Sequence, residues 1–318
     1  MDRTDARHVG VLLVGVMAAA SAVILIRLSS VGPLQLSATR LVLAAAILLP
    51  LALAEWRRAG WWAGGAADAG PLFSAGELFY RTWPGAVFLA LHFVSWAAGA
   101  RMTLAANASL VVNLVPVAMP LMLAAVTTER VRRREVLGTA VALLGVAVLV
   151  YPAVRFDRGT VAGDAVCFVA MLLATAYLIA SRLYRGPLGL WSYLVPLYLM
   201  AGLLCGGAAV VAHGAGVPGC ELVRPDAREW GLLVGLAVVP TVVGHSALNS
   251  AMKHLRPQVV AVLNMGQFVF AGVLAFVLFR ELPAASFYPA AALVMLGGAV
   301  CVGVVRWPGW GRSGRVDH

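Results

Sequence analysis

Charged residues are scarce in this chain. Only 12% of its 318 residues are Asp, Glu, Lys or Arg, whereas 61% are hydrophobic. Globular domains carry about 25% charged and about 45–50% apolar residues, so no water-soluble core of this length absorbs so much apolar surface. The shortage of charge excludes an ordinary soluble domain and predicts a protein of the lipid bilayer.

Cysteines and catalytic signatures are few as well. Cys167, Cys205, Cys220 and Cys301 lie far apart, which matches neither a disulfide framework nor metal-ligand spacing, so they are interpreted as packing residues. The sequence contains no HExxH, no GxSxG, no P-loop and no pair of carboxylates within an apolar run. We therefore expect no enzyme, no cofactor, no metal site and no direct use of ATP.

Lysine is almost absent. The chain has a single lysine, Lys253, and 23 arginines, and its net charge is +10. Such a charge suits nucleic acid, but the arginines are scattered between apolar runs, with a single cluster at 132–134. The charge is interpreted as membrane topology, and no nucleic-acid partner is expected.

Ten apolar runs are long enough to cross a hydrocarbon core about 30 Å thick, which needs about 20 residues per helix. The first is expected to be retained, because it is too long for a signal peptide and no small-residue cleavage site follows Arg27. The sequence thus predicts an all-α polytopic membrane protein with spans at 9–27, 34–54, 84–100, 104–127, 135–151, 161–181, 189–212, 229–250, 258–279 and 284–305.

The cations outside the spans are unevenly distributed, with sixteen on the side of both termini and seven on the other. The positive-inside rule then places both termini in the cytoplasm and the protein in the cytoplasmic membrane. The long loop at 55–83, where Trp56, Trp61 and Trp62 lie near two arginines, is expected to rest at the cytoplasmic headgroups.

The two halves of the chain resemble each other. Aligning Asn113 with Asn264 pairs Ala100 with Ala251 without a gap and, after one inserted residue, Glu129 with Glu281. Further upstream Arg27 pairs with Arg182. Because each half holds five spans, the second copy is inverted in the membrane, and such repeats place a substrate site at their interface. We expect two inverted five-helix repeats, at 1–155 and 156–318.

The stretch ASLVVNLVP at 108–116, the pair Glu129–Arg130 and the glycine-rich run at 135–150 resemble an EamA-type member of the drug/metabolite transporter superfamily. The second half matches through 259–282. The resemblance implies a secondary transporter that exports small organic solutes, such as amino acids, metabolites or drug-like compounds, by alternating access. Where this family's second repeat often has Glu followed by Pro, this chain has Gln267 and Phe268, so no carboxylate is expected at 267.

Polar side chains inside the spans require a reason, since a charge at a helix centre costs about 2.5–3.5 kcal/mol. Asn264 and Gln267 share a face at the repeat position of Asn113, which favours a cavity between the repeats. The residues expected to bind substrate are Arg40, His92, Trp96, Asn113, Tyr177, His245, Asn249, Asn264 and Gln267.

Each candidate also has a structural interpretation. Asn113, close to Pro116 and Pro120, either lines the cavity in a broken helix or makes an interhelical hydrogen bond worth about 0.6 kcal/mol. Arg40 either snorkels to the headgroups or faces the interior, where it attracts a substrate carboxylate. Asp164 is expected first as a helix-capping residue, with proton transfer as the alternative.

The expected partners are a small-molecule substrate, the lipid bilayer and, if transport is coupled, protons carried by His92, His245 or Asp164. Gly138, Ala142 and Gly145 form a small-residue stripe that serves either close helix packing or a homodimer. The competing function is a membrane sensor or scaffold that keeps a transporter fold without moving any solute.

Overall fold

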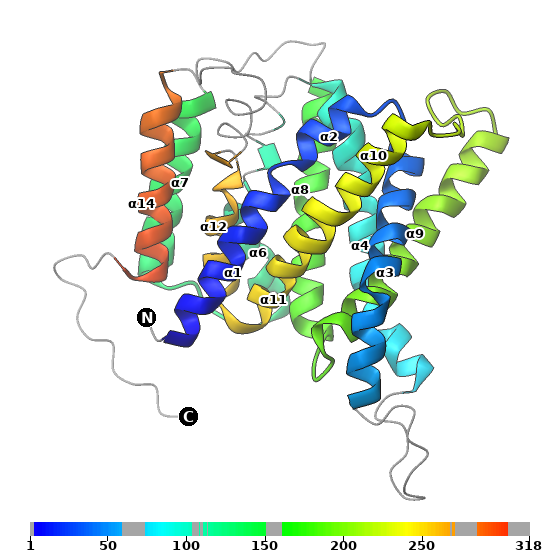
Figure 1. Ribbon diagram of the computed structural model, residues 1–318. Coiled ribbons are helices and arrows are strands. Elements are labelled where there is room, and N and C mark those ends of the chain that lie inside the picture. The colour runs from blue at the N-terminus through cyan, green and yellow to red at the C-terminus, as the bar shows by residue number, and fades with distance from the viewer. Residues whose placement is uncertain are drawn as a thin grey trace, which may run out of the picture.

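The computed structural model describes residues 3–58, 74–103, 108, 111–112, 114–150, 161–267, 269–270 and 285–304. Within these ranges every regular element is a helix, which agrees with the predicted all-α fold (Figure 1). The elements are α1 (Arg3–Ala19), α2 (Ala22–Leu28), α3 (Pro33–Arg58), α4 (Ala75–Met102), α6 (Val115–Val126), α7 (Arg133–Val150), α8 (Val161–Tyr184), α9 (Leu190–Gly214), α10 (Ala227–Leu236), the π-helix η1 (Ala237–His245), α11 (Ser246–His254), α12 (Pro257–Asn264) and α14 (Phe287–Val302).

Among the residues that the structure describes, six helical stretches are long and apolar enough to cross a membrane, so the chain is a multi-pass membrane protein. They are Ala6–Leu28, Pro33–Arg58, Ala75–Met102, Val161–Tyr184, Leu190–Gly214 and Ala227–His254. The remaining predicted spans fall on α6, α7, α12 and α14, and parts of the spans at 104–127 and 258–279 lie outside the described residues.

The first predicted span is interrupted, since α1 ends at Ala19 and α2 begins at Ala22. Between them the Ser21 hydroxyl donates a hydrogen bond to the Ala18 carbonyl at 2.8 Å. A serine that bonds locally to the backbone competes with the helical ladder, which a pattern of apolar residues alone does not show. The break places Ala20 and Ala22 beside the central cavity described below.

The predicted loop at 55–83 is helical at both ends, because α3 continues to Arg58 and α4 already begins at Ala75. The start of α4 is stabilised by Ser74, whose hydroxyl accepts a hydrogen bond from the Glu77 amide, and by an ion pair of 2.8 Å between Arg81 and Glu77. The positions of Trp61 and Trp62 lie outside the described residues.

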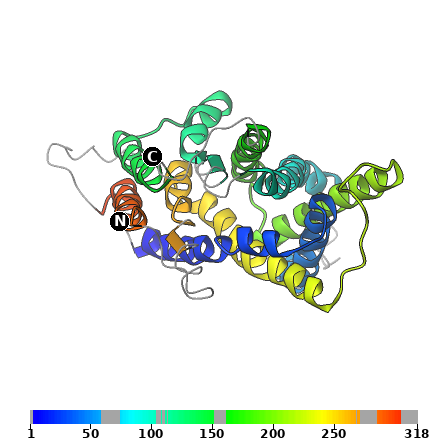
Figure 2. The same ribbon diagram turned by 90° about the horizontal axis from the view of Figure 1, so that it is seen from above.

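The helices pack in pairs drawn from the two halves of the sequence. α3 packs against α9, α4 against α8, α7 against α14, and α1 against η1 and α11. Both views place α7 and α14 together at one edge of the bundle and α9 at the opposite edge (Figures 1 and 2). The four cysteines are free thiols, and all except Cys220 are buried, as expected of packing residues.

Glycines bring α7 and α14 into backbone contact. A Cβ atom at Gly138 would lie 2.6 Å from the Gly297 carbonyl oxygen and 2.9 Å from the Cys301 amide nitrogen. Gly145 is equally restricted, because a Cβ atom there would lie 2.7 Å from the Ala290 carbonyl oxygen. The small-residue stripe of α7 is therefore covered by α14 of the same chain, which supports the close-packing interpretation.

We predict that Gly138→Ala lowers the thermal stability of the detergent-purified protein. The added methyl group meets backbone atoms that cannot rotate away, and overpacking of this kind costs about 1–3 kcal/mol. Gly207→Ala on α9 is the matched control, because a Cβ atom there meets nothing within 4 Å. Thermal unfolding followed by tryptophan fluorescence compares the two, and an equal Tm for both variants would contradict the close contact.

Candidate substrate cavity

A cavity of about 140 Å³ lies in the middle of the bundle. Seven of the nine predicted binding residues line it, Asn249 lies next to it, and Asn113 falls outside the described residues. The described lining consists of Ala19, Ala20, Ala22, Val23, Arg40, His92, Phe93, Trp96, Val112, Val115, Ala174, Tyr177, Leu178, Pro240, His245, Leu248, Asn264 and Gln267.

Arg40 of α3 points into the protein and is only 2% exposed, so the snorkelling interpretation is wrong. Its Nε and Nη2 atoms both donate to the Thr241 hydroxyl oxygen, at 3.1 and 2.8 Å. The guanidinium carbon lies 4.0 Å from the centre of the Phe93 ring, a cation–π contact. One edge and one face of the guanidinium are thus held by the protein.

Thr241 can hold Arg40 because of the π-helix in which it lies. Pro240 has no N–H group, so the Leu236 carbonyl, four residues earlier, loses its α-helical donor. The Thr241 hydroxyl donates to that carbonyl at 2.7 Å, and the lone pairs of the same oxygen accept from Arg40. π-helical turns often occur at functional sites.

The two histidines that line the cavity have different partners. His92 Nδ1 lies 2.8 Å from the Ala170 carbonyl oxygen, so Nδ1 carries a hydrogen, and Nε2 is an acceptor when the ring is neutral. His245 packs its ring against Phe93 at a centroid distance of 4.9 Å, and its buried Nδ1 has no hydrogen-bond partner among the described residues.

Tyr177 and Asn249 form a bonded pair at the edge of the cavity. The Asn249 side-chain amide donates to the Tyr177 hydroxyl oxygen and, at 2.8 Å, to the His245 carbonyl. Asn249 is 2% exposed and does not contact the cavity itself. Its role in this structure is to position Tyr177, whose ring lies 6.0 Å from that of His245.

Asn264 and Gln267 approach the cavity from the end of α12, where the helix gives way to a turn at 265–266. The Gln267 amide donates to the Asn264 carbonyl oxygen at 2.6 Å. The cavity therefore receives the remaining amide donors and acceptors of both side chains, which are neutral.

The prolines of α6 leave a backbone carbonyl without its helical donor. Pro120 cannot donate to the Pro116 carbonyl, and the Gln258 side-chain amide donates to it instead, at 2.8 Å. Gln258 also donates to the Thr139 hydroxyl at 2.7 Å, so it joins α12 to α6 and α7. This carbonyl belongs to helix packing.

Asp164 lies outside the described cavity lining. Its Oδ1 atom accepts a hydrogen bond of 2.5 Å from the Thr103 hydroxyl, which joins the first turn of α8 to the end of α4.

Phe93 and Thr241 were not predicted as site residues. Only Thr241 carried a signal in the sequence, because a hydroxyl directly after a mid-span proline commonly satisfies the freed carbonyl.

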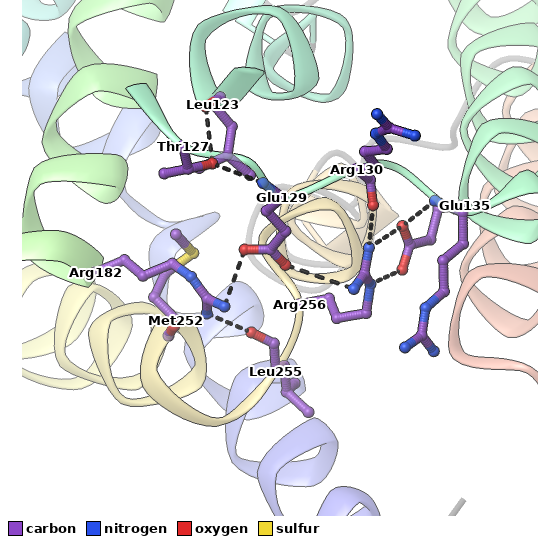
Figure 3. Close-up of polar contacts among 10 residues, drawn as sticks. Leu123, Thr127, Glu129, Arg130, Glu135, Arg182, Met252, Leu255 and Arg256 are labelled. Atoms are coloured by element: carbon purple, nitrogen blue, oxygen red, sulfur yellow. Dashed lines mark hydrogen bonds and ion pairs between the residues drawn. The ribbon is translucent and has the colours of Figure 1, made fainter. Parts of the chain in front are cut away.

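An ion-pair network lies about one helical turn beyond the cavity. Arg182 follows the lining residue Leu178 by four positions, and Met252 follows the lining residue Leu248 by four positions. Glu129 contacts Arg182 Nη2 at 3.1 Å and Arg256 Nη1 at 3.6 Å. Glu135, which is fully buried, accepts from Arg256 Nε and, at 3.1 Å, from Nη2. Arg182 Nη1 donates to the Met252 and Leu255 carbonyls (Figure 3).

Comparison with known proteins finds a family similarity in the first part of the chain. A sequence model of the EamA-like transporter family matches residues 8–151. No curated protein matches the sequence. A solved structure described only as the crystal structure of a protein superposes with a TM-score of 0.73 and 20% identity, covering 94% of this chain and 99% of the other. That likeness shows the fold. Residues 8–151, somewhat less than half of the chain, therefore match the EamA-like transporter family, which belongs to the drug/metabolite transporter superfamily.

Proposed function

We propose that this protein is a secondary transporter that exports small organic solutes across the cytoplasmic membrane by alternating access. The observation that carries this proposal is the central cavity, which receives polar side chains from both halves of the sequence. Arg40, His92 and Trp96 come from 1–155, whereas Tyr177, His245 and Asn264 come from 156–318. Substrate sites of inverted-repeat transporters lie at such an interface.

Two arginine contacts support the inverted five-helix repeats, 1–155 and 156–318. Arg27 Nη2 donates to the Ala100 carbonyl at 3.1 Å, and its aligned counterpart Arg182 donates to the Met252 carbonyl at 2.7 Å. Met252 directly follows Ala251, which the alignment pairs with Ala100. The helix contacts follow the same symmetry. The alignment makes α4 the counterpart of η1 and α11, and α8 the counterpart of α1. The contact of α4 with α8 therefore corresponds to the contact of α1 with η1 and α11, and both are present.

The ion-pair network gives alternating access a physical basis. It links the loop after α6, the end of α8 and the turn between α11 and α12, at the end of the bundle where α1 begins (Figure 1). The topology expected from the arginine distribution makes this end cytoplasmic. Opening the cavity to the cytoplasm requires these helices to separate, so the network closes that end until it breaks.

We predict that Ala174→Phe abolishes solute flux without unfolding the protein. Ala174 lines the cavity, and a phenyl group there occupies much of its volume. Flux is measured in proteoliposomes with a panel of labelled organic acids, amino acids and cationic drugs. Ala208→Phe on the exposed face of α9 is the matched control and is expected to retain flux.

A folded wild-type protein that moves none of these solutes would contradict transport and favour a sensor or scaffold. Repeating the assay under an imposed pH gradient tests coupling to protons through His92 or His245. Flux that does not respond to the gradient would contradict that coupling.

We also predict that Glu129→Gln opens the cytoplasmic end. The substitution removes the carboxylate shared by Arg182 and Arg256, so a cysteine placed at Leu178 in a cysteine-free background should react faster with a water-soluble maleimide. Glu77→Gln breaks an ion pair with Arg81 that lies outside the network and is the control. Equal labelling rates in the two variants would contradict a closing role for the network.

A further inference from the structure

We propose that the cavity selects solutes carrying a single negative charge, namely compact organic carboxylates, and that Arg40 binds the carboxylate group. This inference rests on the proposed transport function and adds the class of substrate. Three independent features support it: the charge balance of the cavity, the donors that Arg40 leaves unused, and the size of the cavity together with the apolar residues in its lining.

The charge of Arg40 is not balanced by any described neighbour. The recorded ion pairs of the described residues use Glu77, Glu129, Glu135 and Glu229, and none of them involves Arg40. The described cavity lining contains no Asp or Glu. Burying an unpaired charge in an apolar bundle is costly, and an anion that enters beside it offsets that cost. The cavity therefore favours an anionic occupant over a neutral or cationic one.

The guanidinium is held in a way that leaves donors for a ligand. Thr241 accepts from Nε and Nη2, and Phe93 covers one face. Nη1 has no acceptor among the described residues, and Arg40 belongs to the cavity lining. A planar guanidinium that is fixed in orientation and retains free N–H groups is well suited to a carboxylate.

One part of the cavity lining suits a small apolar body, while His92, His245, Asn264 and Gln267 make other parts of it polar. Phe93 and Trp96 contribute aromatic rings, and Ala174, Leu178 and Leu248 contribute aliphatic surface. The volume of about 140 Å³ is close to that of an engineered cavity of about 150 Å³ that holds benzene. An ammonium group would meet the like charge of Arg40 and would find no carboxylate among the described lining residues. Benzoate-sized acids therefore fit better than cationic drugs.

The test is direct binding to the detergent-purified full-length protein, measured by isothermal titration calorimetry with three compounds of nearly equal shape. Benzoate is the anion, benzamide the neutral isostere and benzylamine the cation. We expect benzoate to bind at least about tenfold more tightly than either of the others. Arg40→Gln should remove this preference, and Arg40→Lys, which keeps the charge, should retain part of it.

Arg81→Gln is the control for loss of a positive charge, because Arg81 pairs with Glu77 away from the cavity and should leave benzoate binding unchanged. Size-exclusion chromatography checks that each variant is folded. If Arg40→Gln does not fold, Arg40→Lys and the three compounds on the wild type still decide the question. The proposal is overturned if benzoate does not bind the folded wild type, if benzamide or benzylamine binds equally well, or if a folded Arg40→Gln variant keeps the preference.

The two proposals fail in different ways. Benzoate binding that depends on Arg40, together with no flux of any solute in liposomes, would refute transport and leave the anion site standing. Flux of neutral or cationic solutes that persists in Arg40→Gln would support transport and overturn the assignment of Arg40. Benzoate flux that is lost in Arg40→Gln and kept in Arg81→Gln would support both.

Discussion

A permanently charged guanidinium lies in the middle of an apolar helical bundle, and several unusual features of the structure serve to hold it. Arg40 bonds to Thr241 and stacks on Phe93. In the π-helix η1, Pro240 removes the α-helical donor of the Leu236 carbonyl, and the Thr241 hydroxyl donates to that carbonyl while it accepts from Arg40. The cost of burying the charge thus accounts for the contacts that hold Arg40 and for the anion selectivity that we propose.

The need to satisfy backbone carbonyls within the membrane explains polar contacts both at the cavity and outside it. In a bilayer every backbone carbonyl must find a donor within the protein, because no water is present in the hydrocarbon core. Pro120 frees the Pro116 carbonyl, and Gln258 from another helix supplies the donor. Pro240 frees the Leu236 carbonyl, and Thr241 from the same helix supplies it. The carbonyl freed by Pro120 thereby takes part in a contact between helices, whereas the carbonyl freed by Pro240 bonds to Thr241, which holds Arg40 at the cavity.

Helix contacts of two kinds divide the bundle. Where Gly138 of α7 meets Gly297 of α14, the two backbones are in direct contact and no side chain separates them, so α7 and α14 form a closely packed pair. Around the cavity, contacts depend on hydrogen bonds and ion pairs such as that of Glu129 with Arg182, which separate at lower cost when water enters. Alternating access, as proposed, would use the second kind of contact and preserve the first.

Much of the architecture was predictable from the sequence, because apolar run length reflects bilayer thickness directly. The helical fold, most of the span positions and seven of the cavity residues followed from that pattern and from polar residues within it. The break after Ala19, the direction in which Arg40 points and its contacts with Phe93 and Thr241 did not follow. They depend on which helices meet, and α3, α4 and η1 are brought together only by the tertiary fold. By itself, the sequence determined that polar groups lie within the membrane. Only the packed helices decided that a buried cation faces a cavity whose described lining carries no opposite charge, since side-chain direction depends on neighbours far away in the chain.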